Sequence, residues 1–193
     1  MSSTNRSDAR NEHVADYYVT PPAEIDKFLK EFKKIVRGFK NFNILDPCAG
    51  GDTVNPMSYP VVLRQHGCEN ITTIDIREDS LAEIKEDYLQ VNVNLCNCYD
   101  MIITNPPFNL ALPIIEKALF DVRVGGYVIM LLRLNFFGTK ARKPFFDKYM
   151  PKYAFVHNKR MSFTKGGGTD SIEYMHCVWQ KNDYPEFAQL KVI

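Results

Sequence analysis

The chain has 193 residues, of which 45% are hydrophobic and 24% charged, and its formal net charge is +1 at pH 7. This length suits a single domain over residues 1–193, and no apolar run approaches the ~18 residues of a membrane span. Five scattered cysteines without Cys-x-x-Cys spacing favour a reducing, cytoplasmic location over a disulfide framework, and no cysteine or histidine spacing predicts a metal site.

The N-terminal part predicts a flexible segment followed by a helix. Residues 1–13 are polar, and we expect them to be flexible. Apolar residues recur at helical spacing from 25 to 35 and predict an amphipathic helix. Thr20 is placed to cap this helix, with proline in its first turn.

Two predicted strands that end in aspartate follow. Residues 42–46 form the first strand and run into a glycine-rich loop, 47–51, in which glycine lets the backbone approach a ligand closely. After a helix at 57–65, residues 71–75 form the second strand and end at Asp75. An acidic residue at this point of a nucleotide-binding fold accepts hydrogen bonds from ribose hydroxyls, although Asp75 could instead cap the next turn.

The next segment carries weaker signals. Residues 80–86 predict a short helix, and residues 88–93 are expected to form the third strand, although their asparagines have low strand propensity.

The most distinctive stretch is the turn Asn105-Pro106-Pro107-Phe108, which follows a buried strand at 99–104. Proline cannot donate to a sheet ladder and disfavours helix at the preceding residue, so the strand stops here. The turn gathers the Asn105 amide, backbone carbonyl oxygens and the Phe108 ring at the carboxyl edge of a sheet, where ligands bind in α/β folds. Such a turn can hold a planar group that carries an NH2. The alternative is a proline turn with a core phenylalanine.

The rest of the chain continues the alternation of helices and strands. It predicts a helix at 110–119, a buried strand at 127–132, a helix that packs Phe145 and Phe146, and two strands at 153–157 and 174–179. The last two strands are expected to pair as a hairpin around a long glycine-rich loop. The histidines show no triad or ligand spacing and are expected to be structural: His13, His66, His157 and His176.

Positive charge is concentrated in residues 133–165, which carry nine basic side chains and one acidic one. A solvated surface is the ordinary explanation for scattered lysines. This segment is one-sided enough to favour a surface that contacts phosphates.

The turn at Asn105 resembles the catalytic tetrapeptide of class I S-adenosylmethionine-dependent amino-methyltransferases, above all small phage-like DNA N6-adenine methyltransferases. The run from Asp46 to Gly50 resembles their Asp-Pro-x-x-Gly cofactor motif, although adjacent glycines replace the usual Gly-x-Gly. The resemblance and the order of elements together predict an α/β, Rossmann-like, doubly wound and mostly parallel sheet of seven strands with an antiparallel edge hairpin.

The resemblance implies S-adenosylmethionine as cofactor. Tyr18 and Thr20 would close over its methionine end. Asp87 would accept from the adenine amino group while Tyr88 packs on the adenine face. The expected cofactor-binding residues are Tyr18, Thr20, Asp46, Pro47, Cys48, Ala49, Gly50, Asp75, Ile76, Asp87 and Tyr88.

The resemblance also implies a substrate surface. Arg160-x-x-Phe163 resembles the element that lines the target-base pocket, although Phe163 could be hairpin core. The expected substrate-binding residues are Arg133, Lys140, Arg142, Lys159, Arg160 and Phe163. Because the chain leaves no room for a separate target-recognition domain, specificity is expected from the loops at 133–145 and 158–172, a partner chain or a homodimer.

The expected reaction is direct methyl transfer to the N6 amine of a flipped-out adenine in DNA, with Asn105, Pro106, Pro107 and Phe108 as the catalytic residues. The alternatives are adenine in structured RNA, cytosine N4 and a protein glutamine. A different class of protein, a non-catalytic subunit that only binds nucleic acid, would keep the same fold.

Overall fold

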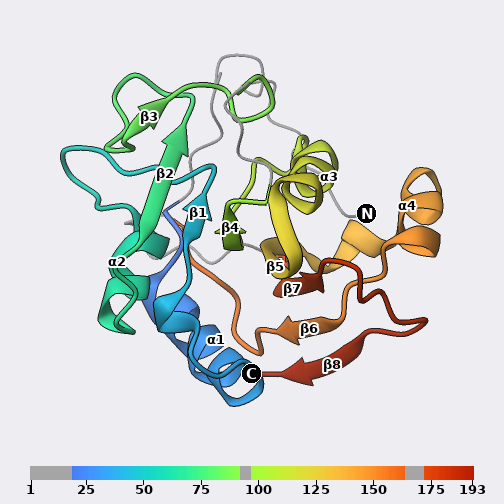
Figure 1. Cartoon of the computed structure of the whole chain (residues 1–193). Helices are drawn as coiled ribbons and strands as arrows, with labels where there is room; N and C mark the ends of the chain where they lie inside the picture. Colours follow the sequence, from blue (N-terminus) through green and yellow to red (C-terminus); the bar gives the residue numbers. More distant parts are fainter. Residues whose placement is uncertain (1–18, 92–96, 164–171) are drawn as a thin grey trace, which may run out of the picture.

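A computed structural model of the chain describes residues 19–91, 97–163 and 172–193. Strands and helices alternate along most of it (Figure 1). The helices are α1 (Pro22–Ile35), α2 (Ser58–Gln65), α3 (Ala111–Asp121) and α4 (Lys143–Lys148), with short 3-10 turns η2 (Phe39–Asn41), η3 (Leu134–Phe137) and η4 (Lys140–Arg142). The strands are β1 (Ile44–Asp46), β2 (Ile71–Asp75), β3 (Ile84–Lys85), β4 (Tyr99–Thr104), β5 (Val122–Arg133), β6 (Tyr153–Val156), β7 (Tyr174–Gln180) and β8 (Gln189–Val192).

The strands form one sheet of eight in the order β3-β2-β1-β4-β5-β7-β6-β8. All pairs are parallel except the two that β7 makes with β5 and β6. The α/β, doubly wound and mostly parallel sheet predicted from the sequence is therefore confirmed. The chain order reverses between β1 and β4, and ligands bind at such a switch point in open α/β sheets.

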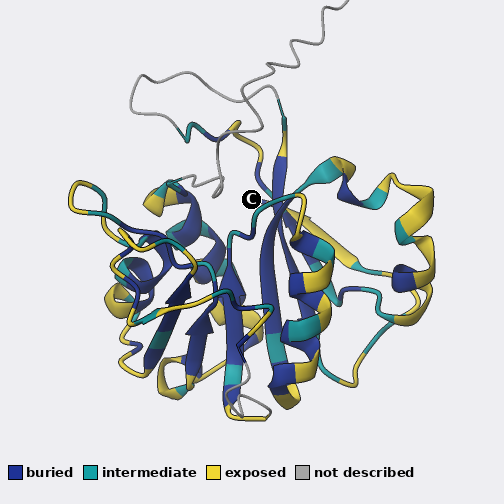
Figure 2. Cartoon of the chain, turned by 90° about the horizontal axis from the view of Figure 1, so that it is seen from above, coloured by how far each residue is buried: buried dark blue, intermediate teal, exposed yellow. Residues whose placement is uncertain are grey.

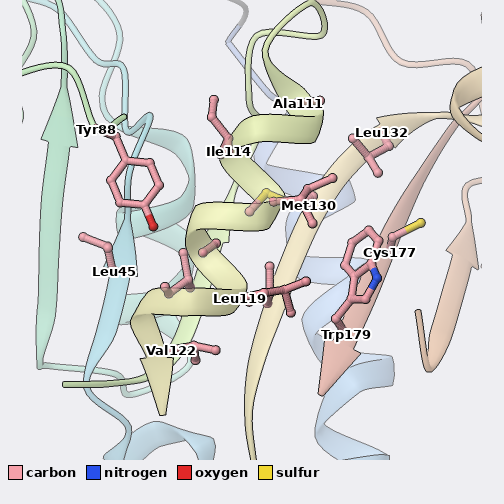
Figure 3. Close-up of a cluster of buried hydrophobic side chains, with 14 of the residues drawn as sticks. Leu45, Tyr88, Ala111, Ile114, Leu119, Val122, Met130, Leu132, Cys177 and Trp179 are labelled. Carbon is pink, nitrogen blue, oxygen red and sulfur yellow. The ribbon is translucent and has the colours of Figure 1, made fainter. Parts of the chain in front are cut away.

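Two hydrophobic layers cover the sheet, because successive side chains of a buried strand face opposite sides. Met101 and Ile103 of β4 pack with α1 and α2, whereas Ile102 between them packs with α3. Figure 1 shows α1 and α2 on one side of the sheet and α3 on the other. The α3 cluster extends to Trp179 of β7 (Figure 3). In Figure 2 the central strands are mostly buried, whereas β8, the loops and the outer sides of the helices are exposed.

Four predictions for individual elements are wrong. The helix predicted at 80–86 does not form, because Ser80 Oγ donates to Gly50 O and Thr73 Oγ1 accepts from Glu83 N; residues 84–85 instead form β3. A turn replaces the strand predicted at 88–93, in so far as residues 88–91 are described. Thr20 does not cap α1, whose N-cap is Pro21 with no side-chain hydrogen bond.

The fourth correction concerns the sheet's edge. The sheet has eight strands rather than seven, since β8 pairs in parallel with β6. The hairpin of β6 and β7 forms as expected, but antiparallel β7 lies inside the sheet, between β5 and β6. All four residues of β8 are exposed, although its sequence Gln-Leu-Lys-Val alternates polar and apolar residues. The strand is only four residues long, and no strand was predicted there. No helix among the described residues is long and apolar enough to cross a membrane.

Candidate cofactor and substrate site

The switch point begins with Asp46, the last residue of β1, whose side chain is fully buried. Oδ1 accepts from the backbone N–H of Cys48 at 3.3 Å. Burial raises the pKa of Asp46 to about 7, although the nearby Thr104 hydroxyl opposes the shift. Within the described structure, Asp46 Oδ2 and Thr104 Oγ1 have no partner at full hydrogen-bond geometry. The ends of β1 and β4 therefore present buried polar atoms at the point where a ligand is expected.

The glycine-rich loop after β1 is tied to the end of β2. Gly50 and Gly51 both have positive φ, at 65° and 78°, which other residues rarely adopt. A Cβ on Gly51 would lie 2.7 Å from Met57 Cγ, so this position also needs glycine for space. Arg77 Nη2 donates to Gly51 O at 2.7 Å, and Ser80 holds Gly50 O at 2.6 Å. The loop's backbone is thereby set next to Asp46 and the end of β2.

Asp75 ends β2 and is buried. Its Oδ2 accepts from Gly50 N at 2.8 Å, and its Oδ1 accepts from Arg77 N at 2.9 Å and Arg77 Nε at 3.3 Å. Asp75 therefore caps the following turn, which was the alternative to the expected ribose contact, and the ribose contact stays a prediction. Sequence reasoning missed Arg77 and Ser80, because nothing local to them indicates that they would reach the loop.

The turn after β4 fixes the amide of Asn105. Its Nδ2 donates to Thr20 Oγ1 at 3.0 Å, across 85 positions of sequence. That bond orients the amide and leaves Oδ1 buried without a hydrogen-bond partner in the described part of the chain. Pro106 is buried, and Pro107 O accepts from Leu110 N at 2.9 Å, so the turn leads directly into α3.

Aromatic rings and one guanidinium surround Phe108. Its ring centroid lies 5.8 Å from that of Tyr174, and Phe163 packs edge-on against the same tyrosine at 5.0 Å. The guanidinium carbon of Arg133, at the end of β5, lies 4.2 Å from the Phe108 ring centroid. The structure thus links the predicted site residues Thr20 with Asn105 and Arg133 with Phe108, and it adds Tyr174, which lies between Phe108 and Phe163.

Comparison with known proteins bears on the fold. Neither the family models nor the curated proteins gave a match to the sequence. Among solved structures, a proposed class I S-adenosylmethionine-dependent methyltransferase from Listeria monocytogenes is 16% identical, with a TM-score of 0.64, over 91% of this chain and 65% of that one. A proposed RNA methyltransferase from Pyrococcus horikoshii is 12% identical, with a TM-score of 0.61, over 86% and 87%. This chain has the class I methyltransferase fold.

A third similar structure is the modification subunit of a proposed type I restriction enzyme from Vibrio vulnificus. It is 12% identical, with a TM-score of 0.59, over 93% of this chain and 46% of that one. The chain spans less than two thirds of the Listeria and Vibrio proteins. Identities this low establish the methyltransferase fold and leave substrate and partners to the chemistry of the site.

Some of the other predicted cofactor residues lie at the carboxyl edge of the sheet beside Asp46 and Asp75. Cys48 and Ala49 lie in the loop beside Asp46, where Ala49 N donates to Ile74 O at 2.9 Å. Ile76, directly after Asp75, is 52% exposed, and Leu81 on the same rim is 49% exposed. These apolar side chains are available to a flat ring at the edge of the methyltransferase sheet. Tyr18 lies outside the described residues.

Tyr88 is not at this edge. Its ring is buried in the core beneath α3, and its hydroxyl donates to Asp121 Oδ2 at 2.8 Å (Figure 3). The neighbouring Asp87 is half-buried and accepts from Leu89 N at 2.9 Å. The structure therefore separates the Asp-aromatic pair that was expected to hold adenine, and only Asp87 remains near the surface.

The basic segment does not form one continuous surface. Lys140 and Lys159 are exposed, and Arg160 pairs with Glu173 at 3.4 Å. Arg142 donates to Phe136 O at 2.9 Å and to Thr139 Oγ1 at 3.0 Å. Lys152 instead bonds Gln180 and Asp183 at the amino end of β6, the opposite edge of the sheet. The glycine-rich part of the loop, residues 164–171, lies outside the described residues.

Three histidines are hydrogen-bonded, as predicted for structural residues. His66 Nε2 lies 2.9 Å from Asp26 Oδ1. His157 and His176 belong to a buried row in which Tyr59, His176, His157 and Glu24 are joined by contacts of 2.9, 2.8 and 2.9 Å. His13 lies outside the described residues.

Proposed function

We propose that this protein transfers a methyl group from S-adenosylmethionine to the exocyclic N6 amine of adenine in DNA. The observation that carries the proposal is the Asn105 amide, which Thr20 orients in the same four-residue turn as Phe108 and whose buried Oδ1 has no partner among the described residues. An amide oxygen next to an aromatic ring suits a flat base that carries an NH2. It lies at the switch point of a methyltransferase fold, one strand away from the glycine-rich loop.

The residues around Asp46 suit the cofactor. Asp46 Oδ2 is a buried acceptor without a full hydrogen bond among the described residues, the loop turns tightly at Gly50 and Gly51, and Ile76 offers apolar surface for an adenine ring. Asp75 would accept from ribose hydroxyls, and Asp87 would accept from the adenine amino group. When bound, S-adenosylmethionine supplies an electrophilic methyl group on sulfur.

The protein's own residues would make the adenine amine reactive. The amine lone pair is delocalised into the ring, so the nitrogen is a weak nucleophile. Hydrogen bonds from the NH2 to Asn105 Oδ1 and the Pro106 carbonyl favour a more tetrahedral nitrogen, which frees the lone pair. Phe108 stacks on the base and sets the line of attack, a contribution of several kcal/mol from orientation and electrostatics. No base is needed beforehand, because the proton becomes acidic only as the new bond forms.

The target base must leave its helix to reach Asn105, so DNA would be bound with the base flipped out or unpaired. Lys140, Lys159 and Arg160 are exposed on the segments that follow β5 and β6, near the carboxyl edge, and suit phosphate contacts. DNA is proposed over RNA because phenylalanine at the fourth position of the turn resembles the adenine-specific DNA enzymes. Sequence specificity would come from these loops, from a partner chain or from a homodimer.

Incubation with methyl-labelled S-adenosylmethionine and separate pools of DNA, RNA and protein tests the proposal. Nucleoside analysis should find N6-methyladenine in the DNA. Label in RNA adenine or in cytosine would show that the substrate is that base instead, and label in protein glutamine would show that the enzyme methylates a side-chain amide. Cofactor binding by calorimetry without transfer to any pool would indicate a non-catalytic nucleic-acid-binding protein.

A further inference from the structure

Arg133 is unlike the other arginines around the site. It ends β5, where its backbone pairs with Tyr174 of β7, and it is half-buried; among the described residues it forms no ion pair with a carboxylate. Its Nε–H is buried and has no hydrogen-bond partner in the part of the chain that the structure describes, and its guanidinium carbon lies 4.2 Å from the centre of the Phe108 ring. A buried N–H donor without an acceptor lowers the stability of the folded protein. Its position beside the candidate site suggests that a bound ligand supplies the acceptor.

Arg142 provides the comparison within the same basic segment. Its guanidinium carbon also lies 4.2 Å from an aromatic centroid, that of Phe136, and it is also half-buried. Arg142 nevertheless donates to Phe136 O and Thr139 Oγ1. Stacking on a ring therefore does not prevent an arginine here from finding acceptors, and the unpaired Nε of Arg133 is particular to its position.

The unpaired donor of Arg133 has a counterpart in the same site. Asn105 Oδ1 is a buried acceptor without a partner, and Asn105 and Phe108 belong to one four-residue turn. β4 and β5 are adjacent, and Thr104 pairs with Met130, so Arg133 extends beyond the same edge as Asn105. One acceptor and one donor thus border the ring on which a base would stack.

We propose that Arg133 selects the substrate by donating to the ring nitrogen beside the reacting amine, an inference that rests on the proposed function. A substrate that hydrogen-bonds to both Asn105 Oδ1 and Arg133 Nε–H must carry an NH2 donor and, next to it in the same plane, an acceptor. Adenine does so on either side of N6, with N1 and N7. In the free protein the guanidinium covers Phe108; when the base stacks on that ring, the guanidinium moves to the edge of the base. Arg133 is thereby a base contact rather than a phosphate contact.

Methyl transfer to single-stranded DNA containing adenine, 1-deazaadenine or 7-deazaadenine tests this role. Each analogue lacks one acceptor beside N6 and keeps the amine. Losing a hydrogen bond to a charged group corresponds to about a 10- to 100-fold fall in kcat/KM. The wild-type protein should show that fall with one of the two analogues. Arg133→Met should have the lowered kcat/KM already with adenine, and its kcat/KM should be the same for adenine and for the analogue that the wild-type protein disfavours.

Arg142→Met is the matched control, because it removes one charge from the same segment and an equivalent ring contact. In Arg142→Met the ratio of kcat/KM for adenine to kcat/KM for the analogue should equal that of the wild-type protein, even if the affinity for DNA changes. Cofactor affinity by calorimetry and the melting temperature show whether each variant is folded. Equal rates on all three DNAs with the wild-type protein, or an unchanged ratio in Arg133→Met, would overturn the assignment.

Failure of the proposed function has a separate signature. If the wild-type protein methylates none of the DNAs, binding of the free bases adenine, 1-deazaadenine and 7-deazaadenine is measured instead by calorimetry. Weaker binding of one deaza base to the wild-type protein, with no such difference in Arg133→Met, would support the Arg133 contact without turnover. Equal binding of all three bases would overturn it.

Discussion

Two buried polar clusters of this protein differ in how completely they satisfy their hydrogen bonds. The first, the histidine row, consists of Tyr59, His176, His157 and Glu24, and every neighbouring pair is bonded at 2.8 or 2.9 Å. The second, the site cluster, consists of Asp46, Thr104, Asn105 and Arg133, each with a buried atom that lacks a partner among the described residues.

The histidine row needs no ligand to complete it. With neutral rings, Tyr59 donates to His176 Nε2, His176 Nδ1–H donates to His157 Nε2, and His157 Nδ1–H donates to Glu24. Burial lowers the pKa of both histidines, which agrees with neutral rings, and Phe28 stacks on His176 at 4.2 Å. Four residues from separate parts of the chain are thereby joined beneath α1.

The site cluster lies at the carboxyl ends of β1, β4 and β5. A buried polar atom left unpaired costs roughly 1–3 kcal/mol, so several of them in one place mark where the fold gives up stability. Such places are typical of binding sites. The contrast separates polar residues that hold this protein together from polar residues that are available to a ligand.

Asn105→Ala should give the largest effect on function. Loss of the oriented amide should reduce methyl transfer by about 100-fold or more, the size expected for a polar group that acts in the transition state. Cofactor affinity should survive, because Asn105 is proposed to contact the substrate amine. Rates from labelled cofactor and affinities from calorimetry measure the two effects. Loss of both methyl transfer and cofactor affinity would show that the turn has a structural role instead.

His176→Phe should give the largest effect on stability. It keeps a ring against Phe28 but leaves Tyr59 and His157 without their partner, at a cost of about 3–5 kcal/mol in the free energy of unfolding. Tyr59→Phe, which removes only the end of the row, should cost about 1–2 kcal/mol. Denaturant unfolding measures both. Equal, small costs would show that the row is not the structural cluster described above.

Asp75→Ala should weaken cofactor binding by about 1.5–3 kcal/mol, through loss of the ribose contact and of the bonds to Gly50 and Arg77. Calorimetric titration gives the affinity. Arg77→Met separates the two causes, because it removes side-chain support for the loop and keeps the carboxylate. If Asp75→Ala binds the cofactor as tightly as the wild-type protein, the ribose assignment is wrong.

Asp46→Asn should stabilise the protein in a pH-dependent way. The pKa of Asp46 rises from 3.8 to about 7 on folding, so the folded protein retains a proton that the unfolded chain releases between these values. The wild-type protein loses stability as pH rises through that window. The advantage of the variant over the wild-type protein should therefore be larger at pH 8 than at pH 4 by up to about 4 kcal/mol, since each pKa unit corresponds to about 1.4 kcal/mol. The cost of the unpaired amide is the same at both pH values. A gain independent of pH would contradict the raised pKa.

Lys159→Ala combined with Arg160→Ala should give the smallest effect, a flatter dependence of DNA affinity on salt. Each phosphate contact contributes about 0.9 to the slope of log affinity against log salt, so the slope should fall by up to about two units. Phe163→Ala should lower turnover with the slope unchanged, because a stacked ring carries no charge. A double variant with the wild-type slope would remove this loop from the DNA surface, and the excess of positive charge would then suit a partner protein.

The sequence by itself was sufficient for features that short-range chemistry decides. The Asn-Pro-Pro turn ends β4 because proline cannot donate to a sheet, and positive φ at Gly50 and Gly51 agrees with the expected close approach of the loop. Apolar periodicity located α1, α3 and the buried strands, and their order predicted a doubly wound sheet.

Only the tertiary structure decided which side chains meet. Thr20 looked like a helix cap and instead orients Asn105, 85 positions away. Tyr88 turned into the core, and the segment at 80–86 lost its helix to bonds with Gly50 and Thr73. The unpaired donor of Arg133 and the histidine row also depend on strand order. Periodicity and turn chemistry act over a few residues, whereas a hydrogen-bond partner is set by the packing of distant elements.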